Sequence, residues 1–345
     1  MAFNPRCLPM SVGSLPHKDP EAACDVIFEH MPVIPAWPQL PRRSFRENMY
    51  VQYGERFPGL VVDMGREKVL VDRSRAEDEL EPLYFAYLED EVKTWGISAE
   101  HAAGLQTFLT RKEALTAADA IKGQVTGPIS MGLQVTDQAL RPILYDEVLA
   151  DALSKHLRLK ATWMEQQLRQ MHETVIVSLD EPYLSAFGSA FISLSREQII
   201  TALEECFAGL TCLKGLHCCG NTDWSIVLET SVQILSLDAY SYAESLSLYP
   251  EAVGAFLQRG GIIAWGIVPQ DGAEIAAATV AGLVERLEAA WKLLTDKGIP
   301  LEDILAACLI TPSCGLGSVA VEPAERGLEL TAEVSEAVRK KYEIE

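Results

Sequence analysis

Apolar residues in this chain follow two spacings. Short runs rich in Val, Ile and Leu predict strands, and longer stretches with apolar residues three or four positions apart predict helices. The expected strands are "PMSVGSL" (9–15), "PVIPAW" (32–37), "GLVVDM" (59–64), "GQVTGPI" (123–129), "TVIVSLD" (174–180), "LKGLHCC" (213–219), "VQILSLD" (232–238), "IIAWGIV" (262–268) and "ACLITPS" (307–313). The expected helices cover 151–173, 195–210, 249–260, 279–298 and 322–345.

This alternation of strands and helices indicates parallel pairing, because crossover helices connect parallel strands. The strands read as near-continuous apolar runs, which is typical of strands covered on both faces. The pattern predicts an α/β fold, specifically a (β/α)8 TIM barrel. We expect a single catalytic domain over 1–345, with an N-terminal extension and a long loop near 38–58. A doubly wound open sheet is the alternative.

Composition excludes some classes of partner. The 345 residues carry a net charge of −20, which argues against nucleic acid as a partner, because phosphates require a basic surface. No apolar run approaches the ~20 residues of a membrane span, and the N-terminus lacks the apolar region of a signal peptide. We therefore expect a cytoplasmic protein that contacts no membrane, with its eight cysteines reduced.

Polar, reactive residues stand at the ends of several expected strands. They are Ser14, Asp180, Cys219, Asp238 and Cys314. In a barrel the carboxyl ends of all strands open on one face, where active sites are built. The fold would therefore bring these residues together, although they are far apart in the sequence.

The stretch "LHCCGN" holds two possible metal ligands. Strand side chains repeat with a period of two, so His217 and Cys219 point the same way and Cys218 points the other way. An imidazole and a thiolate on one side of a rigid strand are good zinc ligands. A buried cysteine beside a hydrogen-bonded histidine is the alternative.

Cys314 strengthens the zinc interpretation. It follows the last strand, which neighbours the first in a barrel, and Gly315 and Gly317 permit a tight turn there. Asp238, one strand after the His-Cys pair, offers an oxygen ligand, although a helix N-cap or a hydrogen bond at the rim would also explain it. Glu244 is a second candidate for that ligand.

Five motifs, in order along the chain, resemble those of the C-terminal catalytic barrel of cobalamin-independent methionine synthase. "SVGSLPHKDP" (11–20) is similar to that family's "IGS-(F/Y)-P", and "KGQVTGPIS" (122–130) to its "KGMLTGPVT". "LDEPYL" (179–184) is similar to "DEPA", "LHCCGN" to its His-x-Cys, and "TPSCGLGS" to "NPDCGLK". The resemblance implies a TIM barrel of the type shared with uroporphyrinogen decarboxylase, as a single-domain member that represents only the second half of the family enzyme.

The resemblance also implies a zinc site. It places His217, Cys219 and Cys314 at ligand positions, and Asp238 where the family has a glutamate ligand. Zinc would hold the thiol of homocysteine as a zinc thiolate, which is then methylated to methionine.

Substrate-binding residues follow from the same resemblance. Ser14, with the backbone of Val12 and Gly13, matches the part that binds the carboxylate of L-homocysteine. Asp180 matches the aspartate that pairs with its ammonium group, and Glu47 corresponds to a second carboxylate for that group.

The expected methyl donor follows from one difference between this chain and the family. After "TGP" the family continues with a Trp-containing segment that contacts folate, whereas this chain reads "ISMGLQVTD". We therefore expect a methylcobamide, free or on a corrinoid protein, rather than methyl-tetrahydrofolate. The chain has no D-x-H-x-x-G segment for binding cobalamin, so a corrinoid would come from outside. Alternatives are a methyltransferase for another thiol such as coenzyme M, a metal-free decarboxylase, and a non-catalytic, zinc-stabilised protein that docks a corrinoid protein.

Overall fold

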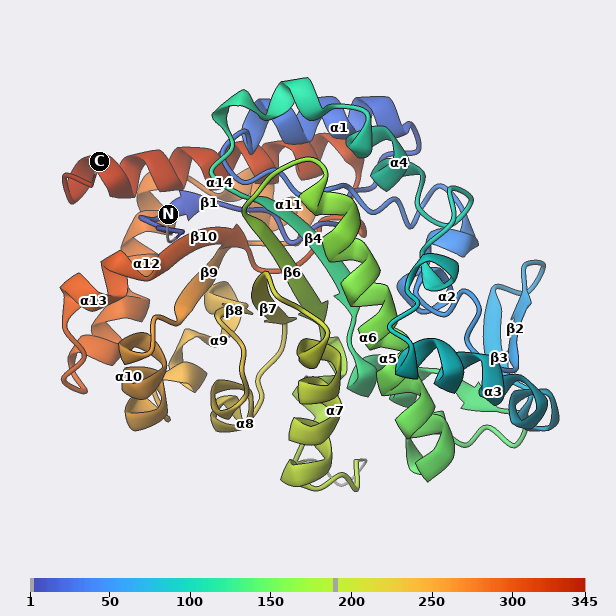
Figure 1. Cartoon of the computed structure of the whole chain (residues 1–345). Coiled ribbons are helices and arrows are strands. Elements are labelled where there is room, and N and C mark those ends of the chain that lie inside the picture. The colour runs from blue at the N-terminus through green and yellow to red at the C-terminus, as the bar shows by residue number, and fades with distance from the viewer. Residues whose placement is uncertain (1–2, 189–191, 345) are drawn as a thin grey trace.

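A curled parallel sheet forms the centre of the molecule (Figure 1). The structure, a computed structural model, describes residues 3–188 and 192–344. Within them, seven strands pair in the order β1-β10-β9-β8-β7-β6-β4, and every neighbouring pair is parallel. The bounds are β1 Leu8–Pro9, β4 Ile121–Thr126, β6 Val175–Asp180, β7 Leu213–Cys218, β8 Ile234–Leu237, β9 Ile262–Val268 and β10 Cys308–Pro312. The prediction of an α/β fold with parallel strands is confirmed.

Helices line the outside of this sheet (Figure 1). The longest expected helix, 151–173, is α6, which begins earlier because the Asp146 side chain accepts hydrogen bonds from Val148 N and Leu149 N. The bounds are α1 Pro20–His30, α2 Met49–Gln52, α3 Arg73–Leu88, α4 Ala103–Leu109, α5 Pro128–Gln134, α6 Glu147–Arg169, α7 Arg196–Ala208, α8 Trp224–Glu229, α9 Ala239–Leu246, α10 Pro250–Gln258, α11 Gly272–Ala277, α12 Val280–Thr295, α13 Leu301–Ala306 and α14 Val321–Lys341. The other expected helices correspond to α7, α10, α12 and α14, with residue 345 outside the described part.

The sheet separates two apolar clusters. In β9, Ile262 and Ala264 belong to a small cluster inside the curl, while Ile263 and Trp265 pack in the large cluster between sheet and helices. Both faces of the strand are buried, which explains why its sequence is apolar throughout. The same burial leaves the carboxyl ends of the strands as the place where polar side chains gather.

A short extended segment lies between the two edges of the sheet. An isolated parallel bridge joins Ser14 to Gln39, and another joins Ala36 to Lys122 on β4. Residues 35–39 thereby connect the chain that follows β1 with β4. The contact consists of single bridges rather than a continuous ladder, so a fully closed eight-stranded barrel stays a prediction.

Prolines explain this irregularity. The expectation of a regular strand over 32–37 is wrong, because no strand forms there in the described structure. Pro32, Pro35 and Pro38 have no backbone N–H and cannot donate to a ladder. The segment therefore makes only isolated contacts with its neighbours.

The expected strand 59–64 exists but belongs to another sheet. β2 (Leu60–Asp63) pairs antiparallel with β3 (Lys68–Val71), which pairs with β5 (Thr136–Asp137). This small sheet lies beside α3, away from the central strands (Figure 1). Its place in the central sheet was predicted wrongly, because an apolar run does not reveal which strand it pairs with.

The long loop expected near 38–58 contains two short helical turns. Ser44 caps a 3₁₀ turn at Phe45–Glu47, and Asn48 caps α2. Caps of this kind satisfy the free N–H groups at helix starts. The segment is ordered by its own side chains and carries Glu47 toward the central sheet.

No helix within 3–188 or 192–344 has the length and apolar character needed to cross a membrane. The domain boundaries 1–345 and the cytoplasmic location stay predictions.

Glu181 ties the end of β6 to the start of α5. Its buried carboxylate accepts hydrogen bonds from Ile129 N at 2.9 Å, Ser130 N at 2.7 Å and Ser130 Oγ at 2.6 Å. Burial raises the pKa of Glu181 to about 7, against the effect of these donors. A Cβ on Gly127 would lie 2.2 Å from Glu181 Oε1, so only glycine fits between β4 and α5.

We predict that Gly127→Ala destabilises the fold by about 1–3 kcal/mol, because the new methyl group must displace a buried, hydrogen-bonded carboxylate. The matched control is Gly254→Ala in α10, where an added Cβ meets nothing within 4 Å. That control should raise the free energy of unfolding by about 0.5–1 kcal/mol, because alanine favours helix. Urea unfolding followed by circular dichroism measures both variants, and a Gly127→Ala protein as stable as wild type would contradict the account.

Candidate functional site

A cavity of about 410 Å³ opens where the central strands end. Six of the seven predicted site residues line it: Ser14, Glu47, Asp180, His217, Cys219 and Cys314. They come from the chain after β1, the 38–58 segment, the ends of β6 and β7, and the loop after β10. The structure therefore brings together the residues that the sequence pattern suggested.

Three of these residues form a cluster of potential metal ligands. One side-chain ligand atom from each of His217, Cys219 and Cys314 lies within 4.8 Å of the others. His217 in β7 and Cys219, one residue past its end, both line the cavity, as the period of two predicted, whereas Cys218 is buried in the large apolar cluster. Cys314 arrives from the far end of the chain because β10 is parallel to β7 in the same sheet.

Ser236 orients the histidine. The strand register places Ser236 of β8 opposite His217 of β7, and its Oγ lies 2.9 Å from His217 Nδ1. With Nδ1–H donating to the hydroxyl, the lone pair is on Nε2. His217 Nε2 is buried and has no hydrogen-bond partner within the described chain. A second partner that fixes the ring in this way is usual for metal-binding histidines.

The two thiols lie close together and shift each other's pKa in opposite directions. The hydrogen bond from the Cys314 thiol lowers the pKa of Cys219, with His217 acting in the same direction and burial opposing them. The same hydrogen bond and burial raise the pKa of Cys314. Of the two, Cys219 is therefore the thiol that loses its proton more readily.

Asp238 has a different contact. Its side chain caps α9 by accepting a hydrogen bond from Ser241 N at 2.8 Å, and it is buried. The ligand cluster found among the described residues does not include it, nor does it include Glu244, which is exposed on α9. Asp238 as a fourth ligand stays a prediction, beside its observed role as a helix cap.

Two carboxylates face the same cavity with an oxygen that has no partner. Asp180 Oδ1 and Glu47 Oε2 are both buried without a hydrogen-bond donor in the described structure. The other oxygen of Glu47 accepts from Arg43 Nη1 at 2.5 Å. Burial raises the pKa of Asp180, an effect that Lys122 opposes, and burial likewise raises that of Glu47, opposed by Arg43. Buried carboxylate oxygens normally have donors, so this pair is suited to receive one from a ligand.

The Cys314 loop packs tightly against Ser14. A Cβ on Gly315 would lie 2.2 Å from Ser14 Oγ, and Gly317 N donates to that oxygen at 3.3 Å. Arg42 Nε donates to the Gly317 carbonyl at 3.0 Å and so joins the 38–58 segment to this loop. The two glycines, expected to serve a tight turn, are also required by this close approach.

Lys122, Gln124 and Ser236 lie next to site residues, although the sequence pattern gives them no role. Lys122 is buried within β4, which is an unusual environment for a lysine. Ser236 stands two positions before Asp238 and so shares its face of β8. The sequence shows a lysine in β4 and a serine in β8, but it does not show their partners. Val12 and His217 come from other segments of the chain.

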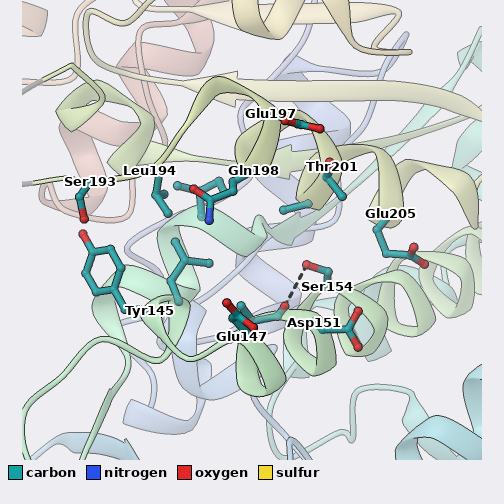
Figure 2. A pocket seen from close by; sticks show the side chains of 14 residues that line it. Tyr145, Glu147, Asp151, Ser154, Ser193, Leu194, Glu197, Gln198, Thr201 and Glu205 are labelled. Atoms are coloured by element: carbon teal, nitrogen blue, oxygen red, sulfur yellow. Dashed lines mark hydrogen bonds between the residues drawn. The ribbon is translucent and has the colours of Figure 1, made fainter.

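A second cavity, of about 520 Å³, lies between α6 and α7 on the outside of the sheet (Figure 2). Acidic side chains line much of it: Glu147, Asp151, Glu197 and Glu205. None of the predicted site residues lies there.

Comparisons with known proteins show the fold but no family. No protein-family model matches the chain, and no curated protein sequence does. A solved structure described as a methyltransferase from Methanosarcina mazei is 15% identical, with a TM-score of 0.58, over 98% of this chain and 95% of that one. This likeness supports the α/β fold.

Two other structures match less of the chain and have lower TM-scores. A B12-independent methionine synthase from Shewanella sp. W3-18-1, in complex with selenomethionine, is 18% identical with a TM-score of 0.48, over 68% of this chain and 67% of that one. A putative vitamin-B12-independent methionine synthase from Listeria monocytogenes is 16% identical with a TM-score of 0.44, over 69% and 70%. Membership of the methionine synthase family therefore stays a prediction from the sequence motifs.

We predict that Cys219→Ser lowers zinc content to about a tenth of the wild-type value or less, because the variant loses one of only two thiolate donors. The matched control is Cys218→Ser, the neighbouring thiol on the opposite side of β7, which should retain zinc. Elemental analysis of protein purified under reducing conditions without chelator measures both. Equal zinc content in the two variants would contradict the assigned ligands.

Proposed function

We propose that the chain is a zinc-dependent methyltransferase that methylates the thiol of L-homocysteine to give methionine. The observation that carries this proposal is one cavity that holds both a His-Cys-Cys cluster and two carboxylates, each with a buried oxygen that has no partner among the described residues. The first group suits a metal that binds a thiol, and the second suits an ammonium group. A thiol amino acid has both.

The residues of the cluster fit zinc. One nitrogen and two sulfur donors are typical zinc ligands, and the buried Nε2 of His217 lacks any protein partner within the described residues. The three ligands of the cluster leave a fourth coordination position for the substrate sulfur, as in catalytic rather than structural zinc sites, and in this proposal Asp238 keeps its role as the cap of α9. When bound, zinc would supply one chemical effect, which is to keep the substrate sulfur deprotonated at neutral pH.

The remaining residues hold and orient the amino acid. Asp180 and Glu47 accept hydrogen bonds from its ammonium group, and Ser14 with the turn at 12–14 binds its carboxylate. Fixing both groups directs the sulfur toward the cluster and limits its motion, which favours an in-line reaction. The sulfur electron pair forms the new bond to the methyl carbon, while the bond between methyl and donor breaks and its electrons leave with the donor.

We propose a methylcobamide, free or on a corrinoid protein, as the donor. Its corrinoid would leave as Co(I), which balances the transfer without another reactant. The Methanosarcina mazei structure is described as a methyltransferase, which agrees with methyl transfer as the proposed reaction. We also propose that residues 35–39 act as the strand that closes an eight-stranded barrel around this site.

The test is methyl transfer by the zinc-loaded protein. We expect methionine from L-homocysteine and methylcobalamin, and little or none with methyl-tetrahydrofolate. No methionine with either donor would overturn the proposed reaction, whereas activity with methyl-tetrahydrofolate only would overturn the choice of donor.

The predicted role of Asp180 gives a variant for this assay. Asp180→Asn should lower kcat/KM for L-homocysteine by about 10–100-fold, because a charged hydrogen bond to the ammonium group becomes a neutral one. The same variant should act normally on 4-mercaptobutanoate, which has no ammonium group. The matched control is Asp72→Asn, since Asp72 caps α3 away from the cavity and asparagine caps equally well. An equal loss for both thiols would contradict the ammonium-binding role.

A further inference from the structure

A buried lysine supports the turn that faces the candidate carboxylate site. Lys122 on β4 is 3% exposed, and its Nζ donates to the Val12 carbonyl at 2.6 Å. Val12 and Ser14 line the cavity, so Lys122 lies directly behind a wall of the site. The lysine thereby connects the interior of the sheet with the turn at 12–14.

Gln124 supports the same turn. It stands two positions after Lys122 on β4 and accepts from Lys122 Nζ at 3.4 Å, while its Nε2 donates to the Trp37 carbonyl at 3.2 Å. Gly13 has a φ of +140°, and an added Cβ would lie 2.6 Å from the Gln124 side-chain carbon. The turn therefore lies flat on the amide of Gln124, and glycine is required at its centre.

The peptide unit between Val12 and Gly13 lies between Lys122 and the side of the turn where an anion would bind. The described residues contain no cis peptide bond, so the Gly13 N–H points away from the Val12 carbonyl, and hence away from Lys122. The Lys122 ammonium group lies at the oxygen end of this peptide dipole. The positive end, which is the Gly13 N–H, therefore lies on the side of the peptide away from Lys122. Backbone N–H groups arranged in this way favour an anion.

The charge of Lys122 has no ion-pair partner among residues 3–188 and 192–344. A buried charge normally has an opposite charge nearby, because desolvation is costly. Asp180 acts on Lys122 electrostatically, but from beyond ion-pair distance, and its free oxygen faces the cavity. A negatively charged ligand group at the turn would complete the balance of charge.

We propose that Lys122, positioned by Gln124, makes the 12–14 turn selective for thiols that carry a carboxylate. Lys122 touches no reacting atom and acts through the turn, so it is a positioning residue. This inference rests on the proposed function, since it specifies which thiols that site accepts. It predicts discrimination between L-homocysteine and 3-aminopropane-1-thiol, which is the same molecule without its carboxylate.

The test is calorimetric binding of these two thiols to zinc-loaded protein. Lys122→Met should weaken L-homocysteine binding by about tenfold or more, because it removes a poorly screened positive charge. Binding of 3-aminopropane-1-thiol should change by less than about twofold. The matched control is Lys160→Met, because Lys160 is also fully buried and donates to a single backbone carbonyl, that of Gly96 at 2.9 Å. That control should bind both thiols as wild type does.

Each outcome separates the inference from the function on which it rests. Wild-type protein that binds neither thiol would overturn the proposed function, and the inference with it. Wild-type binding of L-homocysteine, with Lys122→Met weakening both thiols equally or neither, would overturn only the inference. Tighter binding of the aminothiol by the variant, with homocysteine unchanged, would show that Lys122 merely neutralises Asp180. Circular dichroism and zinc content verify that the variant is folded and loaded, and Lys122→Gln replaces it if Lys122→Met does not fold.

Discussion

Parallel hydrogen bonding between the central strands brings the ends of β6, β7 and β10 together, and the candidate site is built on that arrangement. Because all seven strands of the central sheet run the same way, their carboxyl ends meet at one rim, where Asp180, His217 and Cys314 converge. The ladder between β7 and β8 adds a finer constraint, since it places Ser236 beside His217. A shift of one residue in that register would turn His217 and Cys219 away from the cavity. The cluster therefore depends on the register of the sheet more than on any contact of its own.

Close backbone approach is the second requirement of the site. Gly127 admits the carboxylate of Glu181, Gly13 lies on Gln124, and Gly315 approaches Ser14. In each case a side chain from one segment occupies the space that a Cβ of another would need. These contacts hold the ends of β4 and β6, the 12–14 turn and the Cys314 loop in fixed relation. The donors and acceptors that line the cavity are thus held in position by the fold before a ligand binds.

Local periodicity predicted the features that depend on one strand or helix. The shared orientation of His217 and Cys219 follows from the period of two, and α6 and α7 follow from apolar spacing. Features that depend on pairing between distant segments could not be obtained in this way. The apolar run of β2 does not reveal that its partner is β3. The apolar residues of 32–37 favour a strand, but Pro32 and Pro35 cannot donate hydrogen bonds to a ladder. The role of Lys122 depends on Val12, from another segment, and so emerged only from the structure.

The central claim is that the His-Cys-Cys cluster holds a zinc ion that binds the thiol of L-homocysteine. Zinc K-edge X-ray absorption of the reduced, zinc-loaded protein tests it most directly, because the sulfur atoms around the metal can be counted with and without the amino acid. The account predicts two sulfur neighbours in the free protein and one more after addition of L-homocysteine. A sulfur shell that stays unchanged at saturating L-homocysteine, or protein that retains no zinc, would contradict it.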